Sequence, residues 1–228
     1  MADSIFPSAF TVAVIGAGPI GLAAAAHLVG RGLAVEVFEA GVGVAAHLQS
    51  YGHVRLFSPW RYNVDTAARA LLESTGWAMP DLDGLPTAGE LVEHYLGPLA
   101  AQRALAPHIH FGHQVLGISR AGFDKVKTAG REHADFVLVV QTVEGVKEIR
   151  AQAVIDASGT WGQPNPMGIH GFPALGEGAA QEHIAYGMPD ILGAARGRYA
   201  GRSVMVVGAG HSAAGNLLAL AEIGRAHV

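Results

Sequence analysis

The chain has no cysteine among its 228 residues. This absence excludes a disulfide scaffold, a cysteine nucleophile, a Cys-x-x-Cys redox pair and a thiolate metal site within these residues. The chain also has no unbroken run of about eighteen or more apolar residues, the length that a membrane-spanning helix needs. The most apolar start, Phe10 to Val29, has no basic region before it and contains glycines and a proline, so it reads as a strand and helix rather than a signal peptide. We therefore expect no membrane span.

Charge is scarce. Only 15% of residues are charged, and 15 basic against 19 acidic residues give a net charge of −4 with no basic block. This balance argues against a nucleic-acid binder and against a polybasic membrane patch. Aromatic residues are few, at 7%, but half of the residues are apolar, so the chain can bury a substantial core. We expect a cytoplasmic protein that acts on a small molecule. The sequence is compatible with a homo-oligomer.

Glycine, in contrast, is abundant: 31 of 228 residues is about twice the usual share of roughly 7%. Such a composition favours an α/β protein with many tight turns. The length corresponds to about one and a half domains of ordinary size.

The first forty residues have a strand–helix–strand pattern. Thr11 to Ile15 is a continuous apolar run typical of a buried parallel strand. The alanine-rich segment Ile20 to Gly30 predicts a helix that ends in a left-handed cap at Gly30. Leu33 to Phe38 predicts the second strand, with Glu39 at its end.

The turn between the first strand and the helix has the spacing Gly-x-Gly-x-x-Gly. In such a turn Gly16 permits the tight bend, Gly18 the close approach of a pyrophosphate, and Gly21 the packing of helix on strand. The helix that starts near Pro19 offers backbone amides to phosphate groups. Glu39 is placed to accept hydrogen bonds from ribose hydroxyls. The sequence therefore predicts a dinucleotide site.

Further elements follow in order. We expect helices at Val64 to Ser74 and from a capping box at Thr87 to about Arg103. A small antiparallel meander and one more buried strand should come next, and a Gly/Pro-rich linker should begin at Trp161. The expected strands are His113 to Arg120, Phe136 to Thr142, Val146 to Ala151 and Ala153 to Ala157.

The first pattern repeats near the end of the chain. Ser203 to Val207 predicts a buried strand, the turn Gly-x-Gly-x-x-Ala follows it, and Asn216 to Ile223 continues as a helix. The turn predicts a second dinucleotide site, formed by Gly208, Gly210, Ser212 and Ala213.

With its two turns, GAGPIG and GAGHSA, the chain resembles flavoproteins with two dinucleotide-binding domains, and within them the flavin-containing monooxygenases. The segment VIDASGTWGQPNP is similar to their Ala-Thr-Gly signature, with Ser158 in place of threonine. The resemblance implies FAD at the first turn and NAD(P)H at the second. It also implies that Gly159 closes over the FAD and that Val115 contacts adenine through its backbone.

The sequence differs from these flavoproteins at several motifs, and the differences limit which reactions the chain can catalyse. The regions where disulfide reductases place their redox cysteines contain none here. The monooxygenase fingerprint is matched only in part, by Phe172, Gly178, His183 and Tyr186. The asparagine that many flavin monooxygenases place near the flavin is not evident, so no catalytic residue is assigned.

Other polar and aromatic groups have two interpretations. His108, His110 and His113 suggest a metal site, but no acidic partner has ligand spacing, so we expect no metal there. The cluster Trp60, Arg61, Tyr62 either lines the flavin or packs in the core. His211 either touches a nicotinamide phosphate or faces solvent.

The expected organisation is a Rossmann-like FAD-binding domain (1–162) with a parallel sheet and a small meander, then the start of a Rossmann-like NAD(P)-binding domain (163–222). Residues 223–228 are expected to be a non-native tail, because EIGRAHV (222–228) matches a translated sequencing adapter. The natural protein is expected to continue. The predicted function is a FAD-dependent oxidoreductase that uses NAD(P)H and resembles a monooxygenase. The alternatives are a reductase without a dithiol and a non-catalytic dinucleotide-binding fragment.

Overall fold

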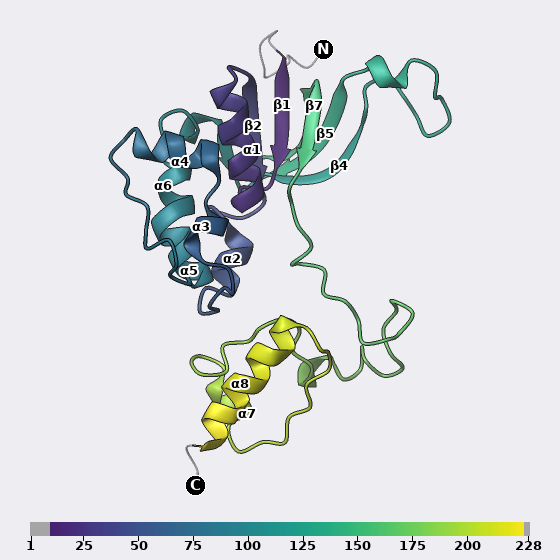
Figure 1. Ribbon diagram of the computed structural model, residues 1–228. Helices are drawn as coiled ribbons and strands as arrows, with labels where there is room; N and C mark the ends of the chain where they lie inside the picture. Colours follow the sequence, from purple (N-terminus) through teal and green to yellow (C-terminus); the bar gives the residue numbers. More distant parts are fainter. Residues whose placement is uncertain (1–9, 226–228) are drawn as a thin grey trace. The chain divides into compact units, whose positions relative to one another are not determined.

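The computed structural model describes residues 10–225, which divide into two compact units (Figure 1). Unit 1 contains the residues up to Ser50 together with Arg55–Gly159, and unit 2 contains Tyr51–Val54 and the residues from Thr160 onward. The division is therefore discontinuous: a four-residue segment from the first third of the chain belongs to the second unit.

A four-stranded parallel sheet forms the centre of unit 1. Its strand order is β3-β2-β1-β7. All five residues of β1 are buried, because both faces of the sheet are covered. This arrangement, with the antiparallel sheet described below, confirms the predicted α/β class. The strands are β1 (Thr11–Ile15), β2 (Ala34–Glu39), β3 (Ile109–Phe111) and β7 (Ala153–Asp156).

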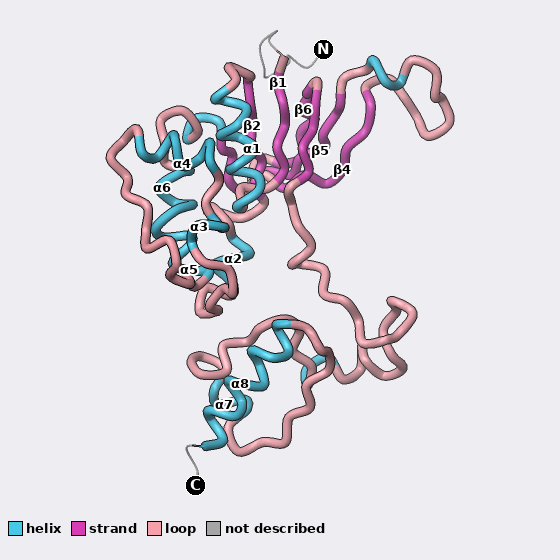
Figure 2. Tube along the Cα trace, in the orientation of Figure 1, coloured by secondary structure: helices cyan, strands magenta, loops and turns pink. Residues whose placement is uncertain are grey.

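Helices cover one face of this sheet (Figures 1 and 2). Leu22 and Ala25 of α1 pack in one core with Val14 and Val37 of the sheet and Leu72 of α4. The helices of unit 1 are α1 (Pro19–Gly30), α2 (Ala46–Ser50), α3 (Trp60–Asn63), α4 (Thr66–Glu73), α5 (Ala88–Leu91) and α6 (Gly97–Ala100), with 3-10 turns at Ala106–His108 and Arg131–His133.

The end of α1 corrects one prediction. The helix ends at Gly30, but the left-handed residue is Gly32, with φ 70°. The amide of Gly32 donates to Val29 O at 2.9 Å, and that of Leu33 donates to Leu28 O at 3.0 Å. The helix thus has its left-handed residue two positions later than predicted.

The helix predicted from Thr87 to Arg103 is also different. Its capping box between Thr87 and Glu90 is present, but a π-helical turn (Val92–Leu96) separates α5 from α6. Pro98 has no amide to donate to the carbonyl of His94, four residues earlier. The indole Nε1 of Trp77 donates to that carbonyl at 2.7 Å instead.

The predicted meander covers the other face of the parallel sheet. Its three strands are antiparallel in the order β4-β5-β6. Leu138 and Val140 of β5 and Ile149 of β6 pack in one core with Ala13 and Phe38 of the parallel sheet. The strands are β4 (Gln114–Arg120), β5 (Phe136–Thr142) and β6 (Gly145–Ala151).

Within its described residues, unit 2 has two helices, α7 (Arg196–Tyr199) and α8 (His211–Arg225), and a 3-10 turn at Gln181–His183. The strand predicted at Ser203 to Val207 is not formed, and Met205 is 86% exposed. The described part of unit 2 contains no strand that could pair with this segment, and an unpaired strand leaves its backbone groups without a ladder.

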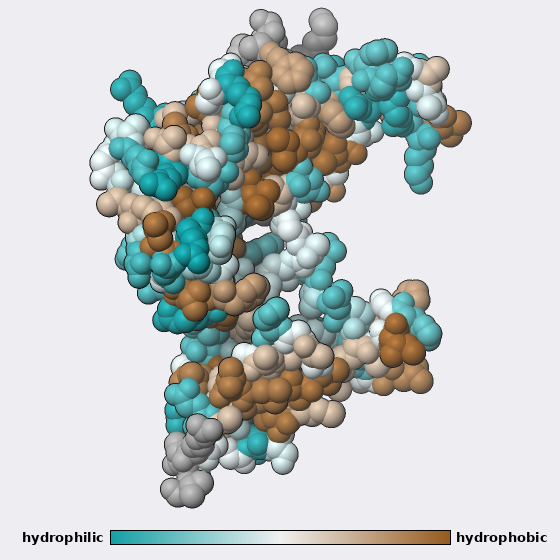
Figure 3. Space-filling model, in the orientation of Figure 1, coloured by the Kyte–Doolittle hydropathy of each residue, from teal (hydrophilic) through white to brown (hydrophobic). Residues whose placement is uncertain are grey.

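The helix of unit 2 is longer than predicted. It begins at His211 and reaches Arg225, with Ile223 buried, while residues 226–228 lie outside the described part. Apolar side chains gather on the surface around α8 (Figure 3), where Leu217 and Leu218 are exposed. No helix within residues 10–225 is long and apolar enough to cross a membrane.

Candidate functional site

The first glycine-rich turn connects β1 to α1 at the carboxyl end of the parallel sheet. Gly16 has φ 96°, and its amide donates to Phe38 O at 2.8 Å, which anchors the turn to β2. Gly18 precedes α1 and makes no side-chain cap, and Pro19 is the first helical residue. The first turn of α1 contains no acidic residue. The backbone amides at the start of α1 therefore have no side-chain acceptor in the first turn, and they can bind an anion.

The three glycines meet different surroundings. A Cβ on Gly21 would lie 1.9 Å from Gly16 O, and one on Gly16 would lie 2.7 Å from Ala157 O. A Cβ on Gly18 would meet no atom within 4 Å. Gly16 and Gly21 are thus required by packing inside the protein, whereas the space above Gly18 is open to a ligand.

Glu39 ends β2 and is hydrogen-bonded to the turn. Its Oε2 accepts from the amide of Ala17 at 2.7 Å, and its Oε1 accepts from the amide of Gly41 at 2.8 Å. The carbonyl of Ala17 accepts from the amide of Ala45 at 3.0 Å. A carboxylate has about four acceptor positions, so each oxygen retains one for a hydroxyl group. The sequence predicted the acid but missed its role in holding the turn.

Val115 lies near the same corner. The amide of His113 donates to Glu39 O at 2.8 Å, and that of Gly112 donates to Gly41 O at 2.9 Å. Val115 follows two residues later, at a β-bulge in the pairing of β4 with β5. The structure thus places the start of β4 beside the acid that ends β2.

Gly159 follows the third strand end at this edge. Asp156 of β7 pairs in register with Ile15, directly before Gly16. Asp156 Oδ1 accepts from the hydroxyl of Ser158 at 2.7 Å and from its amide at 3.0 Å. The hydroxyl bond, followed by the amide bond, lowers the pKa of Asp156. Gly159 has φ 68°, a conformation that favours glycine.

These residues form one cluster at the ends of β1, β2 and β7. Asp156, Ala17 and Ala45 were not predicted. For Asp156 a signal existed, because an acid two residues before a serine can bind its amide in a tight turn. The contacts of Ala17 and Ala45 depend on tertiary packing and have no sequence signal.

The second glycine-rich turn is arranged differently. Gly208 has φ 127°, Gly210 precedes α8, and Ser212 and Ala213 lie in its first turn. The segment before the turn is not a strand, and Val207 is 63% exposed. The residues predicted to bind the second dinucleotide therefore lie on one turn and helix, without the sheet that the prediction assumed.

The histidine group has an acidic partner that the sequence did not reveal. Glu36 of β2 lies between two imidazoles: its Oε2 is 2.6 Å from His110 Nε2 and its Oε1 is 3.4 Å from His108 Nδ1. The short strand β3 brings them together by pairing with β2. No group of three or more His, Cys, Asp or Glu residues within the described chain has the geometry of a metal site.

The residues of the cluster Trp60–Tyr62 differ in burial. Trp60 is buried in the core of unit 1, while Tyr62 is 73% exposed and Arg61 pairs with Asp83. Packing therefore accounts for Trp60.

In unit 2, Tyr186 of the partial fingerprint contacts a buried acid, Glu177, that was not predicted. Glu177 accepts hydrogen bonds from the amides of Met167 (3.1 Å) and Ala174 (2.6 Å) and from the hydroxyl of Tyr186. The bond from Tyr186 lowers the pKa of Glu177 and raises that of Tyr186. Phe172 is exposed.

Comparison with known proteins agrees with this fold. The model of the pyridine nucleotide-disulphide oxidoreductase family matches residues 13–227. No curated protein matches the chain in sequence.

Solved structures that are similar at low identity include the following three. A bacillithiol disulfide reductase, Bdr (YpdA), from Bacillus cereus is 20% identical with a TM-score of 0.53, over 70% of this chain and 43% of its own. An oxidized steroid monooxygenase bound to NADP is 24% identical with a TM-score of 0.50, over 66% and 26%. OTEMO in a FAD-bound form is 20% identical with a TM-score of 0.50, over 67% and 26%. The chain spans less than half the length of each.

Proposed function

Because the chain belongs to the pyridine nucleotide-disulphide oxidoreductase family, which depends on FAD and NAD(P), we propose that it acts as a FAD-dependent oxidoreductase that takes hydride from NAD(P)H. The main support is the first turn. It combines an open approach at Gly18, uncapped amides at the start of α1 and an acid fixed at the end of β2.

Each of these features fits one part of FAD. The amides of the first turn of α1 bind the pyrophosphate, and the missing Cβ of Gly18 lets it approach the backbone. Glu39 orients the adenosine ribose through its free acceptor positions, and the backbone at Val115 contacts the adenine. Gly159 closes the site from the end of β7. When bound, the flavin supplies the two-electron chemistry, and these residues bind and orient it.

We further propose that the reaction is monooxygenase-like rather than a dithiol exchange. The absence of cysteine supports this choice, because a redox pair within these residues is impossible. Gly208, Gly210, Ser212 and Ala213 are the proposed contacts to NAD(P)H. The described residues of unit 2 do not form the parallel sheet that supports such a turn in a Rossmann fold, so a non-catalytic dinucleotide-binding chain is the second candidate.

The test begins with reconstitution of the purified chain with FAD. We expect a flavin absorption spectrum that survives gel filtration, and its loss in a Glu39→Gln variant. Anaerobic addition of NADH or NADPH should then bleach the flavin. Oxygen uptake with oxygenated product identifies a monooxygenase, whereas electron transfer to a quinone without oxygenation identifies a reductase. Bound FAD that neither nucleotide reduces would favour the non-catalytic candidate, and failure to bind FAD would contradict the proposal.

A further inference from the structure

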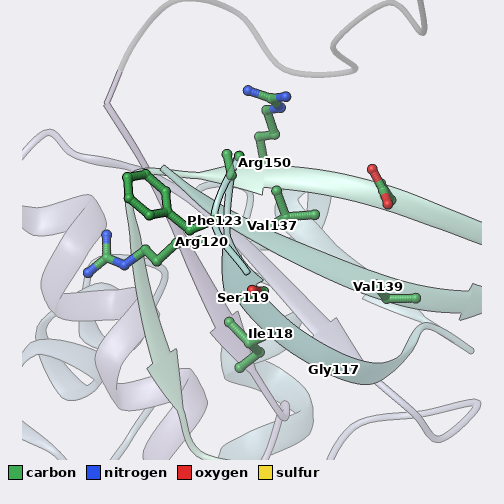
Figure 4. A pocket seen from close by; sticks show the side chains of 11 residues that line it. Gly117, Ile118, Ser119, Arg120, Phe123, Val137, Val139 and Arg150 are labelled. Carbon is green, nitrogen blue, oxygen red and sulfur yellow. The ribbon is translucent and has the colours of Figure 1, made fainter. Parts of the chain in front are cut away.

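The outward face of the three-stranded sheet has a hollow of about 440 Å³ (Figure 4). Residues directly opposite each other in a sheet point to the same face, so the register defines this surface. Ser119, Val137 and Arg150 form one row, and Gly117, Val139 and Glu148 form the next. The inward-facing residues between them, such as Leu138, pack on the parallel sheet.

The shape of this face follows from its residues. Gly117 and Ser119 give β4 almost no outward side chain, and a Cβ on Gly117 would meet no atom within 4 Å. Val137 and Val139 form an apolar strip along the middle strand. We call these four residues, with Glu148 and Arg150, the outer patch. Ile118, also on β4, lines the hollow and is 42% exposed.

The charges of the outer patch are balanced and unpaired. Glu148 and Arg150 are exposed on β6, two residues apart, and within the described residues neither side chain forms a hydrogen bond or ion pair. Arg120 is not part of the patch, because its guanidinium lies over the Phe136 ring at 3.6 Å.

We propose that the outer patch binds a second copy of this chain. An isologous interface brings the same patch of both subunits together, so residue i meets j and j meets i. A two-fold axis across the strands, between the two rows, places β6 against its symmetry mate. Glu148 of each copy then faces Arg150 of the other, and the valine strips meet between them. A singly charged ligand, in contrast, is attracted by one of these side chains and repelled by the other.

The size of the whole outward face, of which the outer patch is a part, sets an upper limit to the strength of the pairing. Three strands at about 4.8 Å spacing and seven residues at about 3.3 Å rise give a face of roughly 14 Å by 23 Å, about 330 Å². Stable dimers bury about 800 Å² per partner. We therefore expect a weak dimer in rapid exchange, visible at high protein concentration.

Charge reversal tests the pairing directly. Sedimentation equilibrium of the full chain should show a dimer that dissociates on dilution and on addition of salt. Glu148→Arg alone, or Arg150→Glu alone, should raise the dissociation constant at least tenfold, because each places like charges together. The double variant, with both reversals in one chain, should restore the wild-type dissociation constant. An equimolar mixture of the two single variants should form a heterodimer.

The matched control is Lys147→Glu. Lys147 lies on the same strand but opposite Val140, on the other side of the sheet, so this reversal should leave the dimer unchanged. Thermal unfolding of each variant checks that the fold is intact. A chain that is monomeric at every concentration overturns the proposal. So does a dimer that the single reversals do not weaken, since another face must then form it.

Discussion

Substitution of two glycines of the first turn by alanine should separate folding from cofactor binding. In Gly21→Ala, the new Cβ would lie 1.9 Å from the backbone oxygen of Gly16, so α1 must move away from β1. In Gly18→Ala, the new Cβ meets no atom within 4 Å, and the φ of −84° is ordinary for alanine. The same chemical change should therefore have opposite consequences three residues apart.

The expected magnitudes follow from packing. Overpacking of a core contact costs about 1–3 kcal/mol, and the obstructing atom of Gly16 is backbone, so we expect about 3 kcal/mol for Gly21→Ala. For a chain of this length that corresponds to a fall in Tm of roughly 6–12 °C. Gly18→Ala should leave Tm unchanged or raise it slightly, because alanine restricts the unfolded chain. Its affinity for FAD should fall, since the Cβ occupies the path of the pyrophosphate.

Two measurements check this pair. Thermal unfolding followed by circular dichroism gives the stability of the apo chain, and titration with FAD, followed by flavin fluorescence, gives the affinity. A Gly21→Ala variant as stable as the wild type would refute the packing argument. A Gly18→Ala variant with normal FAD affinity would refute the assignment of the phosphate site.

Three further predictions concern single contacts. Glu39→Gln should lower the free energy of unfolding by about 1–3 kcal/mol in urea, because the amide offers only one acceptor oxygen where the carboxylate binds two backbone amides. Burial raises the pKa of Asp65, but the amide hydrogen bonds at the start of α4 and the nearby His27 outweigh it, so the net pKa is lowered. The stabilisation by Asp65 is therefore present above its unfolded pKa of about 3.9 and lost as pH falls through the lower folded pKa. Asp65→Asn should flatten the fall in urea midpoint as the pH drops below the unfolded pKa of about 3.9, and an unchanged slope contradicts this. Trp77→Phe should cost about 0.5–1.5 kcal/mol by removing the exposed hydrogen bond to the carbonyl of His94, and a second change, Pro98→Ala, should recover part of the loss in thermal unfolding.

Much of unit 1 could be predicted from the sequence because its signals are local. The apolar run Thr11–Ile15, the glycine spacing and the acid at Glu39 predicted the first strand–helix–strand unit. Alternating residues predicted the three strands of the meander, and the pair Thr87 and Glu90 predicted the capping box.

What could not be predicted depends on partners distant in the sequence. Strand β3 has only three residues, and pairing with β2 forms it, so Glu36 was not recognised as the partner of His108 and His110. An apolar run such as Ser203–Val207 forms a strand only when neighbouring strands satisfy its backbone. The π-helical turn had a local signal in Pro98, but the hydrogen bond that Trp77 Nε1 donates to the freed carbonyl of His94 had none.

The discontinuous division of the chain affects how the two units can be separated. Tyr51 belongs to unit 2, where its ring lies 4.3 Å from that of Trp161. A gene shortened to end at Gly159 would therefore keep Tyr51–Val54 but delete the surface on which Tyr51 packs, leaving an aromatic side chain in water. Production of unit 1 alone calls for two edits: a stop after Gly159 and replacement of those four residues by a glycine-serine linker.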